Sequence, residues 1–296
     1  MNSPIRTDLA LEARELWQQS AGQTTKLEGV RAREGERFGL PVTVVEVLDE
    51  RGEKALGKGR GTYVTVELFG LVRREKAVFA RSVRAVAEQL RGLLGELKGD
   101  DCVLVAGLGN RAITPDCIGP EVCRHTLATR HLLEQLPEQF AGFRPVAVLA
   151  PGVLGTTGME SGETVKAVCA ALRPARVVVV DALACRGVER LCSTVQLTDA
   201  GIAPGSGVGN RRAALDRESL GIPVAAIGVP TVIDGATLAA DLTGQAVPEG
   251  APGRELLVTP RDIDSRAADI AKVIGYAIDL ALHPGVELEE LELLLS

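Results

Sequence analysis

The sequence predicts an α/β fold with a mostly parallel sheet that helices cover on both faces. Short, β-branched apolar runs recur at 102–106, 145–150, 176–181, 193–198 and 223–228. Helical patterns fill most of the gaps between these runs, near 119–135, 160–172 and 261–282. Strands that alternate with helices in this way are typical of parallel sheets buried on both faces. We expect one domain without internal repeats, and a flexible excursion in the Gly/Pro/Ala-rich segment 234–256.

The first hundred residues follow a different pattern. Apolar residues between Leu9 and Trp17 fall on one helical face, and residues 77–97 have the spacing of a long helix. Two runs at 42–48 and 62–68 alternate between apolar and polar residues, which predicts antiparallel strands. The basic, glycine-rich stretch 57–61 is expected to form a turn between them.

Composition narrows the class of protein. The 296 residues are 46% hydrophobic and 24% charged, which is typical of a soluble globular chain with a substantial core. The net charge of −6 argues against nucleic acid as a direct partner. No apolar run reaches membrane-spanning length, and the first residues do not resemble a signal peptide, so a cytoplasmic protein is expected. Six cysteines without zinc-ligand spacing predict reduced thiols.

Two aspartates lie at positions where binding and catalytic residues are found in such folds. Asp116 lies on a Gly/Pro-punctuated loop after the strand at 102–106, and Asp181 directly follows four valines. In open α/β sheets, ligands bind beyond the carboxyl ends of the strands. Two carboxylates brought together there could share one proton and act as an acid–base pair.

Both aspartates also have structural explanations. Asp116 is equally well placed to cap a helix beginning near Gly119, because Asp is a favoured N-cap residue. Asp181 could close a loop, although a carboxylate after four valines is costly to bury without partners. Asp199 and Asp234 also follow strands and are reserve candidates for the same pocket.

Two glycine-rich loops are candidate anion or oxyanion sites. Gly107 and Gly109 follow a strand, as in dinucleotide-binding loops, but Ala112 stands where the third glycine of that fingerprint is required. Gly205 and Gly207 lie in a second loop whose backbone N–H groups could bind an anion. A tight turn and a flexible connection explain the two loops equally well.

Other nucleophiles and metal ligands have little support. His125 and His131 are six residues apart on a helical pattern and do not form a ligand pair. Ser206 lacks the Gly-x-Ser-x-Gly elbow, and no Cys–His arrangement is visible. If the chain is a hydrolase, its carboxylates remain as the reactive groups, and we expect neither a metal nor a cofactor.

Ordered motifs along nearly the whole chain identify a family. The chain resembles the germination proteases, which degrade small acid-soluble spore proteins in spore-forming bacteria. The motifs that carry the resemblance are Arg-Thr-Asp-Leu-Ala at 6–10, Gly-Lys-Gly-Arg-Gly-Thr-Tyr at 57–63, Thr-Pro-Asp-x-x-Gly-Pro at 114–120, Asp-Ala-Leu-Ala at 181–184, Pro-Gly-Ser-Gly-Val-Gly-Asn at 204–210, and the stretches 150–158, 221–232 and 258–264.

The resemblance implies a three-layer α/β/α sandwich similar to hydrogenase maturation proteases, with an atypical aspartic mechanism. The family's proposed catalytic aspartates fall on Asp116 and Asp181. Its self-processing implies a leader at 1–8, cut between Asp8 and Leu9, and a protease domain at 9–296. This leader is shorter than is usual in the family, as is the stretch between Val232 and Leu256.

The resemblance also implies a homotetramer in the forespore or spore core, with small acid-soluble spore proteins as substrates. Arg186 and Lys58 are candidates to bind the acidic residue before the cut, on charge complementarity. Three alternatives stay open: a metal-dependent maturation-type protease of the same fold, a nucleotide-dependent oxidoreductase, and a non-catalytic relative that binds spore proteins.

Overall fold

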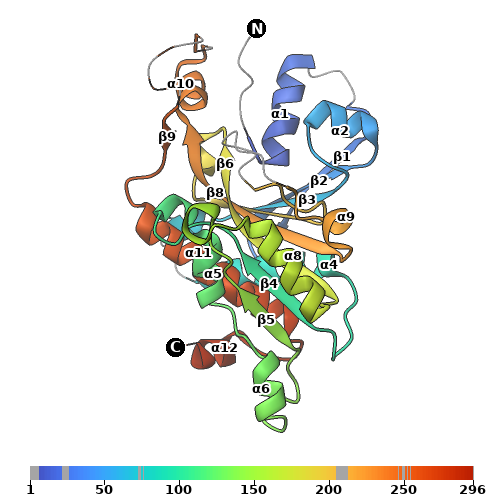
Figure 1. Ribbon diagram of the computed structural model, residues 1–296. Helices are drawn as coiled ribbons and strands as arrows, with labels where there is room; N and C mark the ends of the chain where they lie inside the picture. The colour runs from blue at the N-terminus through green and yellow to red at the C-terminus, as the bar shows by residue number, and fades with distance from the viewer. Residues whose placement is uncertain are drawn as a thin grey trace.

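The computed structural model describes residues 7–21, 27–72, 75, 77–204, 213–245, 247–248, 251, 253 and 255–295. These residues form one large sheet with helices on both faces (Figure 1). The strand order is β1-β2-β3-β7-β8-β6-β4-β5, and β9 pairs with β8. The strands are β1 Val30–Arg37, β2 Leu40–Val47, β3 Gly61–Glu67, β4 Val103–Gly107, β5 Val146–Leu149, β6 Arg176–Cys185, β7 Thr194–Thr198, β8 Val224–Asp234 and β9 Leu257–Val258.

The predicted α/β sandwich is confirmed, and its sheet has two halves of different character. Strands β5, β4, β6 and β8 run parallel to one another. Strands β7, β3, β2 and β1 extend this half through antiparallel pairs. The alternating runs at 42–48 and 62–68 predicted β2 and β3 correctly, whereas the run at 193–198, expected within the parallel series, pairs antiparallel on both sides as β7. The carboxyl ends of the parallel strands therefore meet at one edge of the sheet, which is where ligand sites form in such folds.

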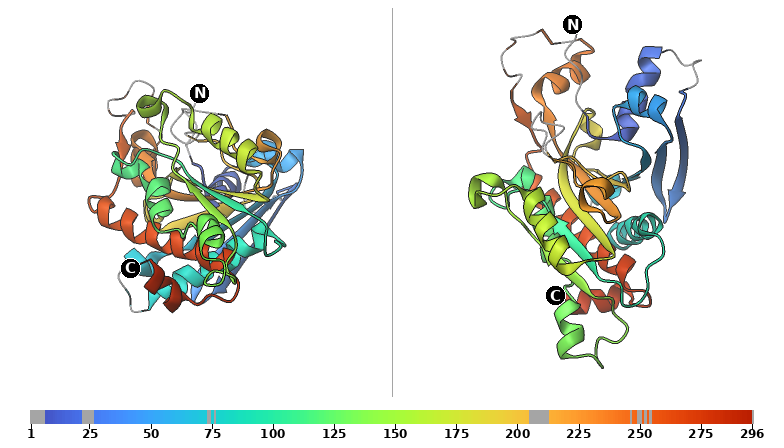
Figure 2. Two further views of the ribbon diagram at one scale, coloured as in Figure 1. Left: turned by 60° about the horizontal axis from the view of Figure 1, so that its bottom comes forward. Right: turned by 45° about the vertical axis from the view of Figure 1, so that its right-hand side comes forward.

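Helices cover the two faces of the sheet in separate layers (Figure 2). Helices α4, α5 and α11 form the main core with one face, while α8 packs on the other. Helix α1 packs on β2 and β3 in a smaller cluster. The longer helices are α1 Ala10–Ala21, α4 Val78–Leu94, α8 Ser161–Leu172, α10 Gly235–Thr243 and α11 Ile263–Leu282. The shorter ones are α2 Glu50–Leu56, α3 Phe69–Val72, α5 Ile118–Arg124, α6 Arg130–Gln135, α7 Leu154–Thr157, α9 Arg217–Leu220 and α12 Leu288–Leu294, with 3₁₀ turns η1 Thr114–Asp116 and η2 Val188–Arg190.

The four valines before Asp181 are explained by burial on both faces of β6. Val178 and Val180 belong to the core with α4 and α11, and Val177 and Val179 belong to the core with α8. Each fully buried valine contributes roughly 1.5–3 kcal/mol of burial free energy. Side chains alternate along a strand, so Asp181 leaves the sheet on the same face as Val177 and Val179.

Three details differ from the sequence prediction. The single helix predicted near 119–135 is two helices, α5 and α6, because the chain leaves α5 at His125 and the Leu127 N–H donates to the buried Asp279 carboxyl group. The predicted excursion at 234–256 contains helix α10, which Asp234 caps. Strand β1 was not predicted, because it is mostly polar and exposed.

No helix in the described ranges combines the length and the apolar character that a membrane span requires.

Candidate active site

The turn that carries Asp116 begins where β4 ends. The chain passes through Gly109 and Asn110 into the 3₁₀ turn η1, whose last residue is Asp116. The Asn110 N–H donates a hydrogen bond to Asp116 Oδ2 at 2.8 Å. Helix α5 begins at Ile118 with Cys117 as its N-cap and has no side-chain cap. The N-cap position that the sequence allowed for Asp116 is thus occupied by Cys117.

The glycines of this loop are required by close packing. A Cβ atom on Gly107 would lie 2.1 Å from the Gly119 carbonyl oxygen, so a side chain there would push α5 off β4. A Cβ atom on Gly109 would lie 2.0 Å from the Asp116 carbonyl oxygen, and its φ of +115° is a conformation that favours glycine. Packing thus accounts for both glycines, and their role toward an oxyanion stays a prediction. Gly205 and Gly207 lie outside the described residues.

Asp181 is buried within the parallel half of the sheet. Its side chain is 5% exposed, and its Oδ1 accepts the Ala182 N–H at 2.9 Å. Its register partner on β8 is Gly228, where a Cβ atom would lie 2.3 Å from Leu183 Cδ1. No side chain therefore rises from β8 directly beside Asp181.

Two hydrogen bonds attach the Asp116 turn to the strands around Asp181. The Leu108 N–H donates to the Val180 carbonyl at 2.7 Å, directly before Asp181. The fully buried Thr231 hydroxyl donates to the Pro115 carbonyl at 2.6 Å, directly before Asp116. The structure thus brings both predicted aspartates to the same edge of the sheet.

The reserve aspartates have structural roles. Asp199 Oδ1 accepts the Thr62 N–H at 2.6 Å, where β3 and β7 pair. Asp234 Oδ1 accepts the Thr237 N–H at 3.1 Å at the start of α10.

The predicted cut site lies along the end of β6. The Asp8 N–H donates to the Ala184 carbonyl at 2.9 Å, and the Ala184 N–H donates to Asp8 Oδ2 at 2.9 Å. The Leu9 side chain is fully buried among apolar side chains of β6, the loop after it and β8: Leu183, Cys185, Leu191 and Ile233. Asp8 and Leu9 thus contact β6 at residues just beyond Asp181.

Gln196 on β7 contacts the same segment, and sequence reasoning missed it. Its Nε2 donates to the Asp8 carbonyl at 3.2 Å, and its Oε1 accepts the Ala10 N–H at 2.7 Å. Its side chain is only 6% exposed. The run Thr-Val-Gln-Leu-Thr alternates polar and apolar residues, so the sequence predicts a solvent-facing row at Gln196 and carries no signal of its burial.

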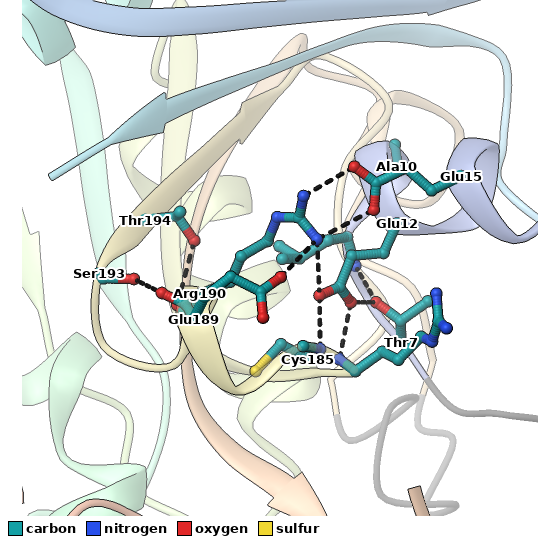
Figure 3. A network of polar contacts seen from close by, with 12 residues as sticks. Thr7, Ala10, Glu12, Glu15, Cys185, Glu189, Arg190, Ser193 and Thr194 are labelled. Carbon is teal, nitrogen blue, oxygen red and sulfur yellow. Dashed lines mark hydrogen bonds and ion pairs between the residues drawn. The ribbon is translucent and has the colours of Figure 1, made fainter. Parts of the chain in front are cut away.

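A second unpredicted group, Glu12, fixes helix α1 to the loop after β6 (Figure 3). The Glu12 carboxylate is fully buried and accepts the Arg186 and Gly187 N–H groups at 2.7 and 2.9 Å. It also accepts the Thr7 hydroxyl and lies 3.4 Å from Arg190, which pairs with Glu15 at 2.7 Å. These contacts hold the segment on both sides of the predicted cut in one position.

A cavity of about 830 Å³ opens beside the cut site. Its lining includes Asp8, Lys58, Tyr63, Gln196 and Gly228. Lys58 Nζ donates to the Thr7 carbonyl at 3.1 Å, so this candidate for acidic recognition lies at the cut site. The Arg186 side chain instead donates to Gln19 Oε1 at 3.4 Å.

The thiols near this edge are poor nucleophiles. Burial raises the pKa of Cys117, directly after Asp116, and raises that of Cys123 to about 11. Both groups are therefore protonated at neutral pH. Among the residues that the structure describes, no group of three or more His, Cys, Asp or Glu side chains is placed to hold a metal ion.

Known proteins similar to this chain define its class and its family. The class is a peptidase, and the sequence profile described as germination protease matches residues 10–247. The chain is 42% identical to the germination protease of Caldanaerobacter subterraneus subsp. tengcongensis, over 98% of each chain. It is 39% identical to that of Clostridium tetani, over 97% of this chain and 98% of the relative. The chain belongs to the germination protease family.

A solved structure also matches part of the chain. It is a [NiFe] hydrogenase maturation protease, HycI, from Thermococcus kodakarensis KOD1, with a TM-score of 0.36 and 20% identity. The match covers 64% of this chain and 98% of that one.

Proposed function

We propose that this chain is the endopeptidase that cleaves small acid-soluble spore proteins after an acidic residue, with Asp116 and Asp181 as its acid–base pair. In this proposal the chain is made as a zymogen and removes residues 1–8 by cleaving its own Asp8–Leu9 bond. The observation that carries the proposal is the hydrogen-bonded pairing of Asp8 with Ala184, just beyond Asp181 on the same strand.

The mechanism follows from two carboxyl groups that share one proton. The ionised carboxylate takes a proton from water, and the water oxygen attacks the carbonyl carbon of the scissile bond. The C–N bond then breaks, and the protonated carboxyl group gives its proton to the departing amine. Such a pair titrates as a unit, so the two roles belong to the pair and not to a named member.

The cut segment indicates the substrate chemistry. Asp8 supplies an acidic side chain before the bond, Leu9 an apolar side chain in a closed pocket, and Ala10 a small residue after it. The family's substrate sites, with Glu before an apolar residue and Ala, have the same order. Assembly as a homotetramer in the spore core is part of the same proposal.

Isosteric substitution of each aspartate tests the catalytic pair. Asp116→Asn and Asp181→Asn chains should fold but lose cleavage of a Glu-Ile-Ala-Ser peptide by about 10²–10⁴-fold, the usual contribution of general acid–base groups. Asp241→Asn, an exposed aspartate on α10, makes the same chemical change elsewhere and should cleave normally. Full activity in either site variant would rule out the pair.

Two further measurements separate the alternatives. N-terminal sequencing after incubation should show a new terminus at Leu9, whereas a non-catalytic binder would keep its original terminus. Elemental analysis together with a chelator control tests the metal-dependent alternative, since loss of cleavage after chelation and its return with one metal would favour that alternative. Thermal protection by a dinucleotide would favour the oxidoreductase.

A further inference from the structure

We propose that Gln196 is a catalytic residue of the self-cleavage, whose side-chain amide donates to the carbonyl of the bond that is cut. This inference rests on the proposed cleavage between Asp8 and Leu9. It adds to the two aspartates a group that binds the reacting carbonyl and stabilises the negative charge that forms on its oxygen.

The contacts of Gln196 bracket the scissile bond. Its Nε2 lies 3.2 Å from the Asp8 carbonyl oxygen, and its Oε1 lies 2.7 Å from the Ala10 nitrogen. The Asp8 carbonyl can only accept, and the Ala10 N–H can only donate. A single orientation of the amide satisfies both partners, so the donor must face the carbonyl.

The arrangement imitates a neighbouring strand. In a parallel sheet, a residue faces one residue of the next strand. Its N–H donates to the carbonyl of the residue before that one, and its carbonyl accepts the N–H of the residue after it. The Gln196 amide makes this pair of bonds around Leu9 and holds the backbone from Asp8 to Ala10. It binds main-chain atoms, so the contact does not depend on the side chains at the cut.

Gln196 and Asp181 lie in one row of the sheet, and Asp8 is bonded to Ala184, three residues further along β6. Gln196 pairs in register with Gly228, and Gly228 pairs in register with Asp181. Register partners project from the same face, and strands lie about 4.8 Å apart, so the two Cα atoms are separated by roughly 10 Å. Gly228 has no side chain of its own, and the Leu183 side chain from β6 occupies the space above it. The carbonyl that Gln196 holds therefore lies on the face of the sheet from which Asp181 projects.

A purely structural role is the competing explanation. Ala10 is the first residue of α1, and its N–H has no partner within the helix. On this explanation, the only role of Gln196 is to accept the Ala10 N–H and so cap the helix. The acceptor and the donor of the amide must therefore be tested separately.

The test is the first-order rate at which the Leu9 terminus appears in the full chain, measured for Gln196→Glu and Gln196→Met. Gln196→Glu keeps an acceptor for Ala10 but loses the donor, and Gln196→Met loses both at similar volume. We expect both variants to be slower by about 10²–10³-fold, as when one oxyanion donor is removed. Gln135→Glu, an exposed glutamine on α6, is the matched control and should process at the wild-type rate.

The pH profile supplies a signature that capping does not share. Protonation of the carboxyl group in the Q196E chain restores an O–H donor, so its rate relative to wild type should rise as the pH falls. If wild type processes and Q196E matches it, the inference is overturned while the proposed function stands. If wild type never yields the Leu9 terminus, the proposed self-cleavage itself fails, and the inference fails with it. Thermal unfolding shows whether each variant has folded. If Q196E has not folded, the processing rate of Q196M is compared with that of wild type instead.

Discussion

Replacing Gly109 by alanine should misplace Asp116 while leaving the core intact. The added Cβ atom would lie 2.0 Å from the Asp116 carbonyl oxygen and 3.1 Å from its Oδ1. Hydrogen bonds hold Leu108 to β6 and Pro115 to β8, so the loop cannot move as a unit and Asp116 is the part left to shift. The overlap must therefore be relieved by a shift of the Asp116 turn itself.

The magnitude follows from backbone strain and displacement. A φ of +115° at a residue with a Cβ atom costs roughly 1–3 kcal/mol. At about 2–4 °C per kcal/mol for a chain of this size class, the unfolding temperature should fall by several degrees. Restoring an ordinary contact distance of 3.4 Å requires a shift of about 1.4 Å, and misplacement by about 1 Å can already cost roughly 10²-fold in rate.

The assay pairs self-cleavage at Asp8–Leu9 with thermal unfolding. Gly92→Ala is the matched control, because Gly92 is exposed on α4 and its Cβ atom would meet nothing within 4 Å. That variant should process normally and gain roughly 0.5–1 kcal/mol, the helix preference of alanine over glycine. Wild-type processing and unfolding in the Gly109→Ala chain would refute the argument that this close approach positions Asp116.

Three further perturbations test other contacts. Arg190→Met leaves the buried Glu12 carboxylate without its cation, so denaturant unfolding should show that the free energy of unfolding falls by about 3–5 kcal/mol. A fall below about 1 kcal/mol would show that the Arg186 and Gly187 N–H groups are enough to stabilise the carboxylate. Thr231→Val removes the hydroxyl that holds the Pro115 carbonyl, so it should cost about 1 kcal/mol and slow self-cleavage, whereas an unchanged cleavage rate would contradict the anchoring role. Burial lowers the pKa of His283 to about 4, below the usual value near 6.5, so this group stays neutral in the fold. The contribution of His283 to stability is present above pH 6.5 and is lost as the pH falls through 4, and at pH 5 the loss is about 2 kcal/mol. His283→Asn should therefore flatten the stability–pH curve in this range. An unchanged slope would show that other groups cause the pH dependence.

Local pattern was enough to find Asp116 and Asp181. Each follows a short apolar run, and strand ends in α/β folds converge on one edge, so the two aspartates predicted a shared site. One part of this prediction is wrong, because β6 continues to Cys185 and Asp181 therefore lies within the strand and not at its end. The same pattern could not separate them from Asp199 and Asp234, which lie at strand ends; all four accept backbone N–H groups, and only their places in the fold differ.

Gln196 and Glu12 could not be found in this way. The partners of Gln196 are Asp8 and Ala10, which are 188 and 186 residues away in the chain. Glu12 binds the backbone of Arg186 and Gly187, at separations of 174 and 175 residues. Pairings of this kind depend on which strands become neighbours, and hydrophobic periodicity carries no information on that choice.

The sequence by itself determined the class of fold, most of the strands and long helices, and the family, because period, turn chemistry and motif order are local properties of the chain. The tertiary structure decided how the parts meet. It placed Asp8 on β6 beyond Asp181, ended α5 early through the buried Asp279 contact, and set Gln196 in one row with Asp181 across Gly228. The row of Gln196 and Asp181 follows from strand order and register, since one step of register would turn either side chain to the opposite face. The end of α5 follows from the packing of α11, which carries Asp279.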